Sequence, residues 1–260
     1  MTSRAITSLN NATVKAVRAL HLRKAREESG LFLAEGLKIV SEAVAAGRSP
    51  RILLHGPDVT DHPALARAAA TARETLEVSA AILAKISRRE NPQMVLGVFE
   101  QALTPLDSLD PAAARCWVAL QAVRDPGNLG TIVRTADAAG CGAVILVGEC
   151  CDPWSVEAVR ATMGSVFATS IARASVAEFV EWRRTWPGAV VGTQLTATSD
   201  FRAVQYRDPT LILMGNEQAG LPAELAAICD MSVKIPMRGR ADSLNLAVAT
   251  GVMIYAVTSG

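Results

Sequence analysis

The sequence lacks any apolar run long enough to cross a membrane. Its longest strongly apolar stretch, residues 244–257, contains Asn245 and Thr250 and is shorter than the roughly 18 residues that a spanning helix needs. Low-complexity tracts are also absent, and Gly and Pro together make up only 30 of the 260 residues, whereas 50% of the residues are hydrophobic. This composition argues against a disordered or fibrous chain. It predicts a soluble globular protein.

The N-terminus lacks the continuous apolar segment of a secretory signal. The chain also has no Cys-x-x-Cys pair, and its odd number of cysteines stand at positions 116, 141, 150, 151 and 229. Neither a zinc site nor a disulfide framework has such spacing. We therefore expect reduced thiols, a cytoplasmic protein and no bound metal.

A segment with prolines and acidic residues, 105–113, separates two apolar regions. A chain of 260 residues forms one large or two modest domains, and such a segment is typical of a linker. The sequence therefore predicts a first domain over residues 1–104 and a second over residues 114–260.

The two parts differ in their hydrophobic patterns. The first part alternates helix-like runs, as at 13–28 and 63–74, with strand-like runs at 51–54 and 94–100, which predicts a small α/β sandwich. The second part has apolar strand candidates at 117–123, 143–147, 189–194, 211–214 and 232–235. Helix-like segments separate these strands, an alternation that predicts a parallel sheet covered on both faces. Ligands of such sheets bind at the carboxyl ends of the strands.

Charge is distributed unevenly along the chain. Residues 1–104 contain 14 Lys and Arg against 10 Asp and Glu, and residues 105–260 contain 12 against 15. The first 26 residues have no acid and six basic side chains, namely Arg4, Lys15, Arg18, Arg23, Lys24 and Arg26. Such a cluster is typical of a surface that binds a polyanion, because each neutralised phosphate releases counterions. A solvated helix face is the alternative interpretation.

The first of three informative loops spans residues 124–130 and leads into a helix that carries Arg134. Pro126 and Gly127 favour a tight turn, Asn128 can cap the helix, and the N–H groups of its first turn form an anion site. Arg134 lies further along the same helix, where it can approach that anion. A capped helix start with no catalytic role is the alternative.

The second loop, 215–222, has glycines on both sides of Glu217, which permits close approach of its backbone to a ligand. It is neither a phosphate-binding loop nor a dinucleotide fingerprint, which disfavours a nucleotide-dependent enzyme. A plain strand-to-helix turn is the alternative.

In the third loop, 235–246, Ser243 is a candidate helix cap. The apolar segment that follows must be covered on every side, by the core or by a second subunit.

Taken together, these loops resemble the three motifs of the SpoU (TrmH) family of RNA ribose 2′-O-methyltransferases. The motifs are N-x-G-x-x-x-R at 128–134, G-N-E-x-x-G-L at 215–221 and I-P-M-x-G-x-x-x-S-L-N at 235–245. Residues 160–165 are similar to the segment that the family has between its first two motifs. Residues 6–36 are similar to the family's N-terminal substrate-binding domain, so the resemblance covers nearly the whole chain.

The resemblance implies the fold and the cofactor. It implies a second domain of the SPOUT type with a trefoil knot, a homodimer formed through the last helix, and S-adenosylmethionine held by the knotted loops. The cofactor-binding residues that it implies are Thr193, Gly215, Ile235, Pro236, Met237 and Leu244. Around the reacting ribose it implies Arg134, Glu217, Ser243 and Asn245, with RNA also contacted by Asn128, Arg18, Arg23 and Lys24.

The reaction that the resemblance implies is an in-line attack of a ribose 2′-hydroxyl on a sulfonium methyl group. All three histidines, at 21, 55 and 62, lie in the first domain, so the domain with the motifs has no histidine base. An arginine has an intrinsic pKa above about 12 and is a poor base. Our hypothesis is that Arg134 binds the adjacent phosphate and lowers the pKa of the hydroxyl, while Ser243 and Asn245 position the ribose and Glu217 orients Asn245 or Arg134.

The separate N-terminal domain resembles that of enzymes acting on large-subunit ribosomal RNA more than it resembles the transfer RNA enzymes. We therefore expect ribosomal RNA as the substrate, with transfer RNA as the alternative. A protein that binds RNA with the same fold but without activity is the second alternative. It is disfavoured because Arg134, Glu217 and Asn245 are all present.

Overall fold

The structure, a computed structural model, describes residues 4–216 and 219–259. The chain forms two compact units. The first consists of Met1–Gln101 together with Asp152–Ala168, and the second of Ala102–Cys151 together with Thr169–Gly260. The segment 152–168 therefore packs with the first unit, although the sequence pattern alone assigns it to the second domain.

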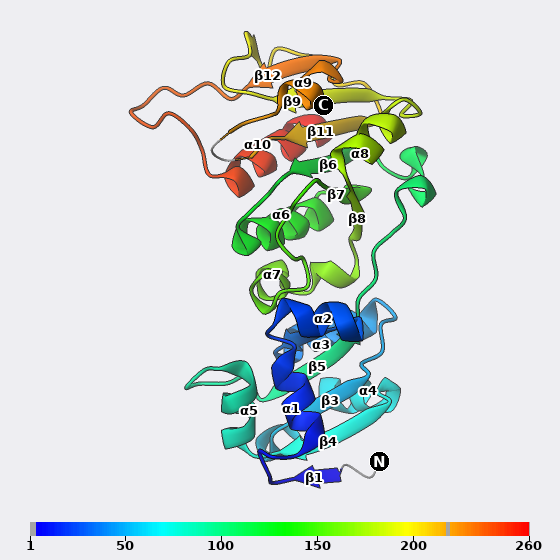
Figure 1. The fold of residues 1–260 in the computed structure, drawn as a ribbon, viewed down its shortest axis with the longest axis vertical. Coiled ribbons are helices and arrows are strands. Elements are labelled where there is room, and N and C mark those ends of the chain that lie inside the picture. Colours follow the sequence, from blue (N-terminus) through cyan, green and yellow to red (C-terminus); the bar gives the residue numbers. More distant parts are fainter. Residues whose placement is uncertain (1–3, 217–218, 260) are drawn as a thin grey trace. The chain divides into compact units, whose positions relative to one another are not determined.

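The first unit contains a mixed sheet with the strand order β1-β4-β3-β5-β2 among the described residues (Figure 1). Strands β1, β4 and β3 are parallel, and β5 runs antiparallel to both β3 and β2. The strands are β1 (Arg4–Ile6), β2 (Leu31–Glu35), β3 (Ile52–His55), β4 (Glu74–Val78) and β5 (Val95–Glu100). The helices and short 3-10 turns of this unit are α1 (Ala12–Ala19), α2 (Arg23–Ser29), α3 (Leu37–Ala45), η1 (Pro57–Val59), α4 (Pro63–Thr71), α5 (Ala80–Ser87), α7 (Val156–Thr162) and η4 (Ser165–Phe167).

The single helix predicted over 13–28 is wrong, because the chain forms two helices there. The Asn11 side chain accepts hydrogen bonds from the first backbone N–H groups of α1, and α2 ends at Gly30, which adopts the left-handed conformation. The break between the two helices lets Val14 and Val17 of α1 face the core while the side chain of Arg26 turns inward.

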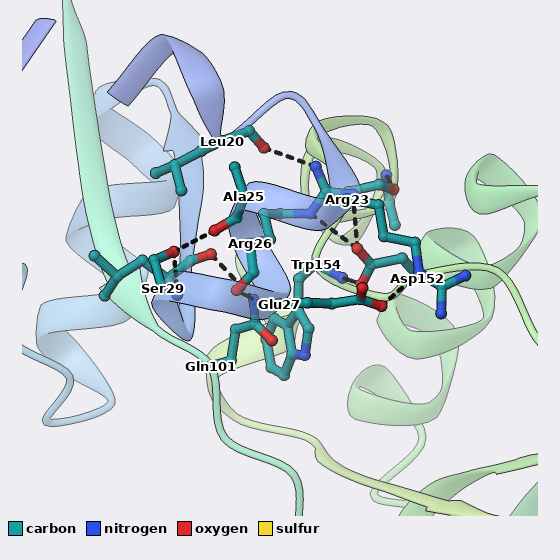
Figure 2. Close-up of polar contacts among 12 residues, drawn as sticks. Leu20, Arg23, Ala25, Arg26, Glu27, Ser29, Gln101, Asp152 and Trp154 are labelled. Carbon is teal, nitrogen blue, oxygen red and sulfur yellow. Dashed lines mark hydrogen bonds and ion pairs between the residues drawn. The ribbon is translucent and has the colours of Figure 1, made fainter. Parts of the chain in front are cut away.

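Arg26 forms a buried ion pair within the first unit (Figure 2). Its side chain is 4% exposed, its Nη2 lies 2.6 Å from Asp152 Oδ2, and its Nη1 donates to the carbonyl of Leu20. Arg26 is thus not available to RNA, which corrects its place in the predicted basic cluster. The pair joins α2 to a segment more than a hundred residues away in the sequence.

A second ion pair and an aromatic cluster hold the segment 152–168 to the same unit. Arg160 Nη2 donates to Glu35 Oε2 over 2.6 Å, and α7 packs against β2, the strand at one edge of the sheet. The rings of Trp154 and Phe167 both pack against Phe32. These contacts cover an edge strand whose unpaired backbone groups are otherwise open to other strands.

The second unit is built on a parallel sheet with the strand order β10-β12-β9-β11-β6-β7-β8 among the described residues. The strands are β6 (Cys116–Gln121), β7 (Ala143–Val147), β8 (Ser170–Ala174), β9 (Ala189–Thr193), β10 (Ser199–Asp200), β11 (Thr210–Met214) and β12 (Met231–Lys234). The helices and 3-10 turns are η2 (Leu106–Ser108), η3 (Pro111–Ala113), α6 (Pro126–Ala138), α8 (Val176–Arg183), α9 (Ala223–Ala227) and α10 (Leu246–Thr258).

The core of the second unit lies against the central strands. All residues of β7 and β11 are buried, which is the pattern of a parallel sheet covered on both faces. Phe179 and Trp182 of α8 and Leu225 of α9 belong to one apolar cluster with the sheet, while α10 packs against α6, β6 and β11. No helix within the described residues is long and apolar enough to span a membrane.

The predicted α/β class and the parallel sheet are confirmed, and all five strands predicted for the second unit are present with small shifts at their ends. In this unit the prediction missed β8 and β10, and in the first unit it missed β1, β2 and β4. Arg173 interrupts the apolar run of β8, and β10 contains only Ser199 and Asp200, so neither has a clear hydrophobic signal.

We expect Asp152→Asn to lower the free energy of unfolding of the first unit by about 3 kcal/mol, because the buried Arg26 charge would lose its counter-ion. The asparagine keeps an acceptor for the backbone N–H of Trp154, so the loss of stability comes from removing the negative charge of Asp152. Native-state hydrogen exchange of α2 and β2 measures it. Glu27→Gln removes the exposed pair with Arg23 and is expected to change stability by less than about 0.5 kcal/mol; equal effects of the two substitutions would contradict the assignment.

Candidate functional site

A cavity of about 400 Å³ opens at the carboxyl ends of β9, β11 and β12. Its volume is within the usual range for small-molecule sites. It lies beside the point where the strand order reverses, since β11 and β7 flank β6 on opposite sides, and such a switch point is where open α/β sheets bind ligands. Six residues predicted from the sequence line it, namely Thr193, Gly215, Ile235, Met237, Ser243 and Leu244.

Other predicted residues lie elsewhere. Pro236, Arg134, Asn128 and Asn245 are not part of the cavity wall, and Glu217 lies outside the described residues. Sequence reasoning missed lining residues that neighbour the predicted ones along the chain: Gln194, Leu195, Thr196, Met214, Asn216, Ala219, Gly220, Leu221, Leu246 and Ala249. Asn216, Ala219, Gly220 and Leu221 lie within the second motif loop, and the signal for the others was their position close to a predicted residue in the sequence.

Close backbone packing shapes the part of the wall formed by residues 215, 216 and 219–221. Asn216 and Gly220 exchange two backbone hydrogen bonds, of 3.1 and 2.9 Å, and Gly220 has a φ of +68°. A Cβ atom on Gly215 would lie 2.3 Å from the carbonyl carbon of Gly220 and 2.5 Å from the nitrogen of Leu221. Only glycine fits at position 215, which explains the first glycine of the motif.

The cavity wall is mostly apolar but contains one unsatisfied hydroxyl group. Leu195, Leu221 and Leu244 contribute aliphatic side chains, whereas Thr193 Oγ1 is buried and has no hydrogen-bond partner in the described structure. Buried polar atoms normally have partners. An apolar cavity with such a hydroxyl in its wall is suited to a ligand that has both apolar and hydrogen-bonding groups.

The chain reaches α6 through a strained residue. Ala122, directly after β6, has a φ of +47°, and the left-handed conformation costs a residue with a Cβ about 1–2 kcal/mol. Its N–H donates to Val147 O, and its carbonyl accepts from Asn216 Nδ2 over 2.9 Å. The first and second loops are thus tied together at this residue.

The caps of α6 and α10 differ from the predicted ones. Asp125, not Asn128, caps α6, and Asn245, not Ser243, caps α10 by accepting from the N–H groups of Ala247 and Val248. Asn245 Nδ2 also donates to Asn128 Oδ1 over 2.9 Å. This bond ties the first loop to the third. Both cap predictions failed because a nearby residue of similar capping ability has the better position.

Arg134 lies on the exposed side of α6 and makes no ion pair with residues 4–216 or 219–259. A Cβ on Gly251 of α10 would lie 3.6 Å from the side chain of Thr135, so the neighbouring residue faces α10. Four arginines of the second unit form ion pairs within the described residues, namely Arg115, Arg183, Arg184 and Arg202, whereas Arg134 shares the lack of an ion pair with Arg124, Arg173, Arg207, Arg238 and Arg240. Arg134 therefore keeps its guanidinium free of a carboxylate from the described chain and able to bind an anion.

Two cysteines of the second unit, Cys150 and Cys229, are poor nucleophiles. Burial raises the pKa of the Cys229 thiol to about 11, and burial also raises the pKa of Cys150. These thiols are protonated at neutral pH and unreactive. Among the described residues, no group of three or more His, Cys, Asp or Glu is placed to hold a metal ion.

Comparison with known families identifies both parts of the chain. The model of the SpoU rRNA methylase family matches residues 115–255, more than half of the sequence, and that of the MRM3-like substrate binding domain matches residues 11–97. The chain belongs to the SpoU rRNA methylase family. The loops at 124–130, 215–222 and 235–246 lie within the residues that this family model matches, and the unit that contains α1 to α5 corresponds to the substrate-binding domain.

Two relatives illustrate the similarity of this SpoU family member to named proteins. The 23S rRNA (guanosine(2553)-2′-O)-methyltransferase RlmP of Bacillus subtilis is 31% identical over 250 residues, which cover 96% of this chain and 97% of the relative. The 23S rRNA (uridine(2479)-2′-O)-methyltransferase of Streptomyces viridochromogenes is 32% identical over 261 residues, with 97% and 91% covered.

Solved structures extend the comparison to the fold. An AdoMet-bound rRNA methyltransferase from Sinorhizobium meliloti is 49% identical with a TM-score of 0.91, and the match covers 98% of this chain and 97% of that chain. The SpoU methyltransferase AviRb from Streptomyces viridochromogenes, in complex with AdoMet, is 30% identical with a TM-score of 0.84 and coverage of 96% and 98%. The match therefore includes both units.

We expect Gly215→Ala to lower the free energy of unfolding of the second unit by about 2 kcal/mol, because the new Cβ would overlap the backbone at Gly220 and Leu221. Urea denaturation measures the change. A control is Gly239→Ala in the third loop, where a Cβ would meet no atom within 4 Å and the change should stay below about 0.5 kcal/mol. A tolerated alanine at 215 would show that the close approach is not required.

Proposed function

We propose that this SpoU family member transfers a methyl group from S-adenosylmethionine to a ribose 2′-hydroxyl of large-subunit ribosomal RNA. The observation that carries the proposal is a cavity at the carboxyl ends of β9, β11 and β12 whose wall contains residues of the second and third motif loops, with the first loop joined to the third by the hydrogen bond from Asn245 to Asn128. The relatives named for 23S rRNA 2′-O-methylation match both units, which favours ribosomal over transfer RNA.

The residues present fit S-adenosylmethionine. Aliphatic side chains of Leu195, Leu221 and Leu244 can enclose an adenine ring, and the unpaired Thr193 hydroxyl is available to a polar edge of the nucleoside. Backbone groups of Gly215, Ile235 and Leu244, with Pro236 and Met237 adjacent, complete the proposed cofactor site. When bound, the cofactor supplies an electrophilic methyl group on a positively charged sulfur.

Arg134 is the proposed activator of the ribose. Its guanidinium has no carboxylate partner in the described chain, so it can bind the phosphate next to the target ribose. The positive charge lowers the pKa of the 2′-hydroxyl electrostatically. The hydroxyl proton would pass to that phosphate or to water when the 2′-oxygen accepts the methyl group.

The other proposed catalytic residues position the ribose. Asn245 uses its Oδ1 to cap α10 and one Nδ2–H for Asn128, which leaves its second Nδ2–H for the substrate. Ser243 lines the cavity and can offer a hydroxyl beside it. Glu217, which lies outside the described residues, is proposed to orient Asn245 or Arg134.

A homodimer formed through α10 and a knotted path of the motif loops are part of this proposal. Val248 and Tyr255 of α10 are 53% and 51% exposed, and their spacing of seven residues places them on one face of the helix. Burying that face against a second copy would remove apolar surface from water. A cytoplasmic location fits a ribosomal RNA substrate.

Two measurements test the function. Isothermal titration with S-adenosylmethionine tests the cofactor, and transfer of tritiated methyl groups to ribosomal and transfer RNA tests the substrate. We expect binding together with labelling of ribosomal RNA. Labelling of transfer RNA alone would favour the transfer RNA alternative, and RNA binding without transfer would favour an inactive RNA-binding protein.

We expect Arg134→Lys to reduce kcat/KM about tenfold, because an ammonium group lacks the two parallel donors with which guanidinium holds a phosphate. Steady-state methyl transfer measures the loss, and cofactor affinity should stay unchanged. Arg184→Lys, on the exposed end of α8, serves as the control with activity near that of the wild type. Near-normal turnover of Arg134→Lys would exclude two-point binding by the guanidinium.

Reversing the charges of Arg18, Arg23 and Lys24 should weaken RNA binding and flatten its salt dependence, by about one unit of slope for each phosphate that the protein no longer binds. Arg23 and Lys24 pair with Glu27 and Glu28 on exposed turns of α2, so they can exchange these partners for phosphates. Binding titrations at several salt concentrations measure the slope. An unchanged slope would remove this cluster from the RNA interface.

A further inference from the structure

The strain at Ala122 lies at the junction between the cofactor loops and the helix that carries Arg134. Ala122 has a φ of +47° without being glycine, and three residues later Asp125 caps α6. The backbone angles of residue 122 therefore set the direction in which the chain enters α6. A conformation that alanine disfavours must be imposed by its surroundings.

Two hydrogen bonds hold the backbone of Ala122: its N–H donates to Val147 O, and its carbonyl accepts from the side chain of Asn216. The Nδ2 of Asn216 donates to the carbonyl of Ala122 over 2.9 Å, and the backbone N–H of Asn216 lies 3.3 Å from Gln121 Oε1. Its Oδ1 accepts from the N–H of Ala219 within the same loop. One amide side chain thus joins the 215–221 loop, which lines the cavity, to the residue that starts the path to α6.

We infer that Asn216 is a positioning residue, which holds Ala122 in the left-handed conformation and thereby aligns Arg134 with the cavity. Only the expected effect on kcat rests on the proposed function. The structural part, that Asn216 fixes the start of α6, stands on the contacts alone. It also explains why an asparagine follows Gly215 without requiring that its side chain contacts a ligand.

The test uses three variants of the full-length protein. Asn216→Asp removes the donor to Ala122 but keeps an acceptor for Ala219. Ala122→Gly removes the cost of the positive φ, because glycine adopts this conformation freely. The double variant combines both. Gln205→Glu adds the same negative charge at an exposed position of the same unit and controls for charge.

For methyl transfer at saturating cofactor, we expect Asn216→Asp to lower kcat about tenfold, the factor that corresponds to the strain of left-handed alanine. Ala122→Gly alone should stay within about twofold of the wild type, and in the double variant it should restore most of the lost kcat. Ala122 lies outside the cavity wall. If Asn216 acted by contacting a ligand directly, Ala122→Gly would not restore the lost kcat. A double variant as slow as Asn216→Asp overturns the inference.

Hydrogen exchange provides a readout that does not depend on activity. Backbone amides of residues 123–134 should exchange faster in Asn216→Asp than in the wild type, recover in the double variant, and stay unchanged in Gln205→Glu. Unchanged exchange in Asn216→Asp overturns the inference. If the wild type transfers no methyl group to RNA, the proposed function fails, while the exchange experiment still decides whether Asn216 holds the start of α6.

Discussion

The cavity depends on the close approach of two backbone segments at the end of β11, where Gly215 leaves no room for a Cβ against Gly220 and Leu221. This contact folds the second loop back on itself and places Asn216 within reach of Ala122. A second link, between Asn245 and Asn128, connects the third loop to the first. Together they bring segments from three distant parts of the chain to one edge of a parallel sheet, which is where such sheets bind ligands.

The first unit depends on a different kind of contact. Its segment 152–168 follows β7 in the chain but is held by the buried pair of Arg26 on α2 with Asp152 and by the pair of buried Glu35 on β2 with Arg160, whose side chain is 36% exposed. Neither pair is free of cost, because burying a charge is unfavourable unless its partner is well placed. These pairs therefore contribute more to the specific position of the segment than to net stability. The chain passes from one unit to the other at each end of this segment.

The sequence alone predicted the class of the fold, because continuous apolar runs, glycines and prolines act locally. The six predicted residues of the cavity wall came from the resemblance of three loops to motifs of the SpoU family. It could not predict which residue caps α6 or α10, since Asp125 competes with Asn128 and Asn245 with Ser243 within a few positions. The burial of Arg26 was also inaccessible, because its partner is 126 residues away. The left-handed Ala122 left no sequence signal, since alanine rarely adopts that conformation.

The location of the transferred methyl group tests the account most directly. Ribosomal RNA labelled by the protein with tritiated S-adenosylmethionine can be hydrolysed in alkali, which cleaves a phosphodiester bond only where the neighbouring 2′-hydroxyl is free. The account predicts that the label remains in an alkali-resistant dinucleotide. Label recovered in mononucleotides would show methylation of a base and would contradict a site built to align a ribose hydroxyl with the methyl donor.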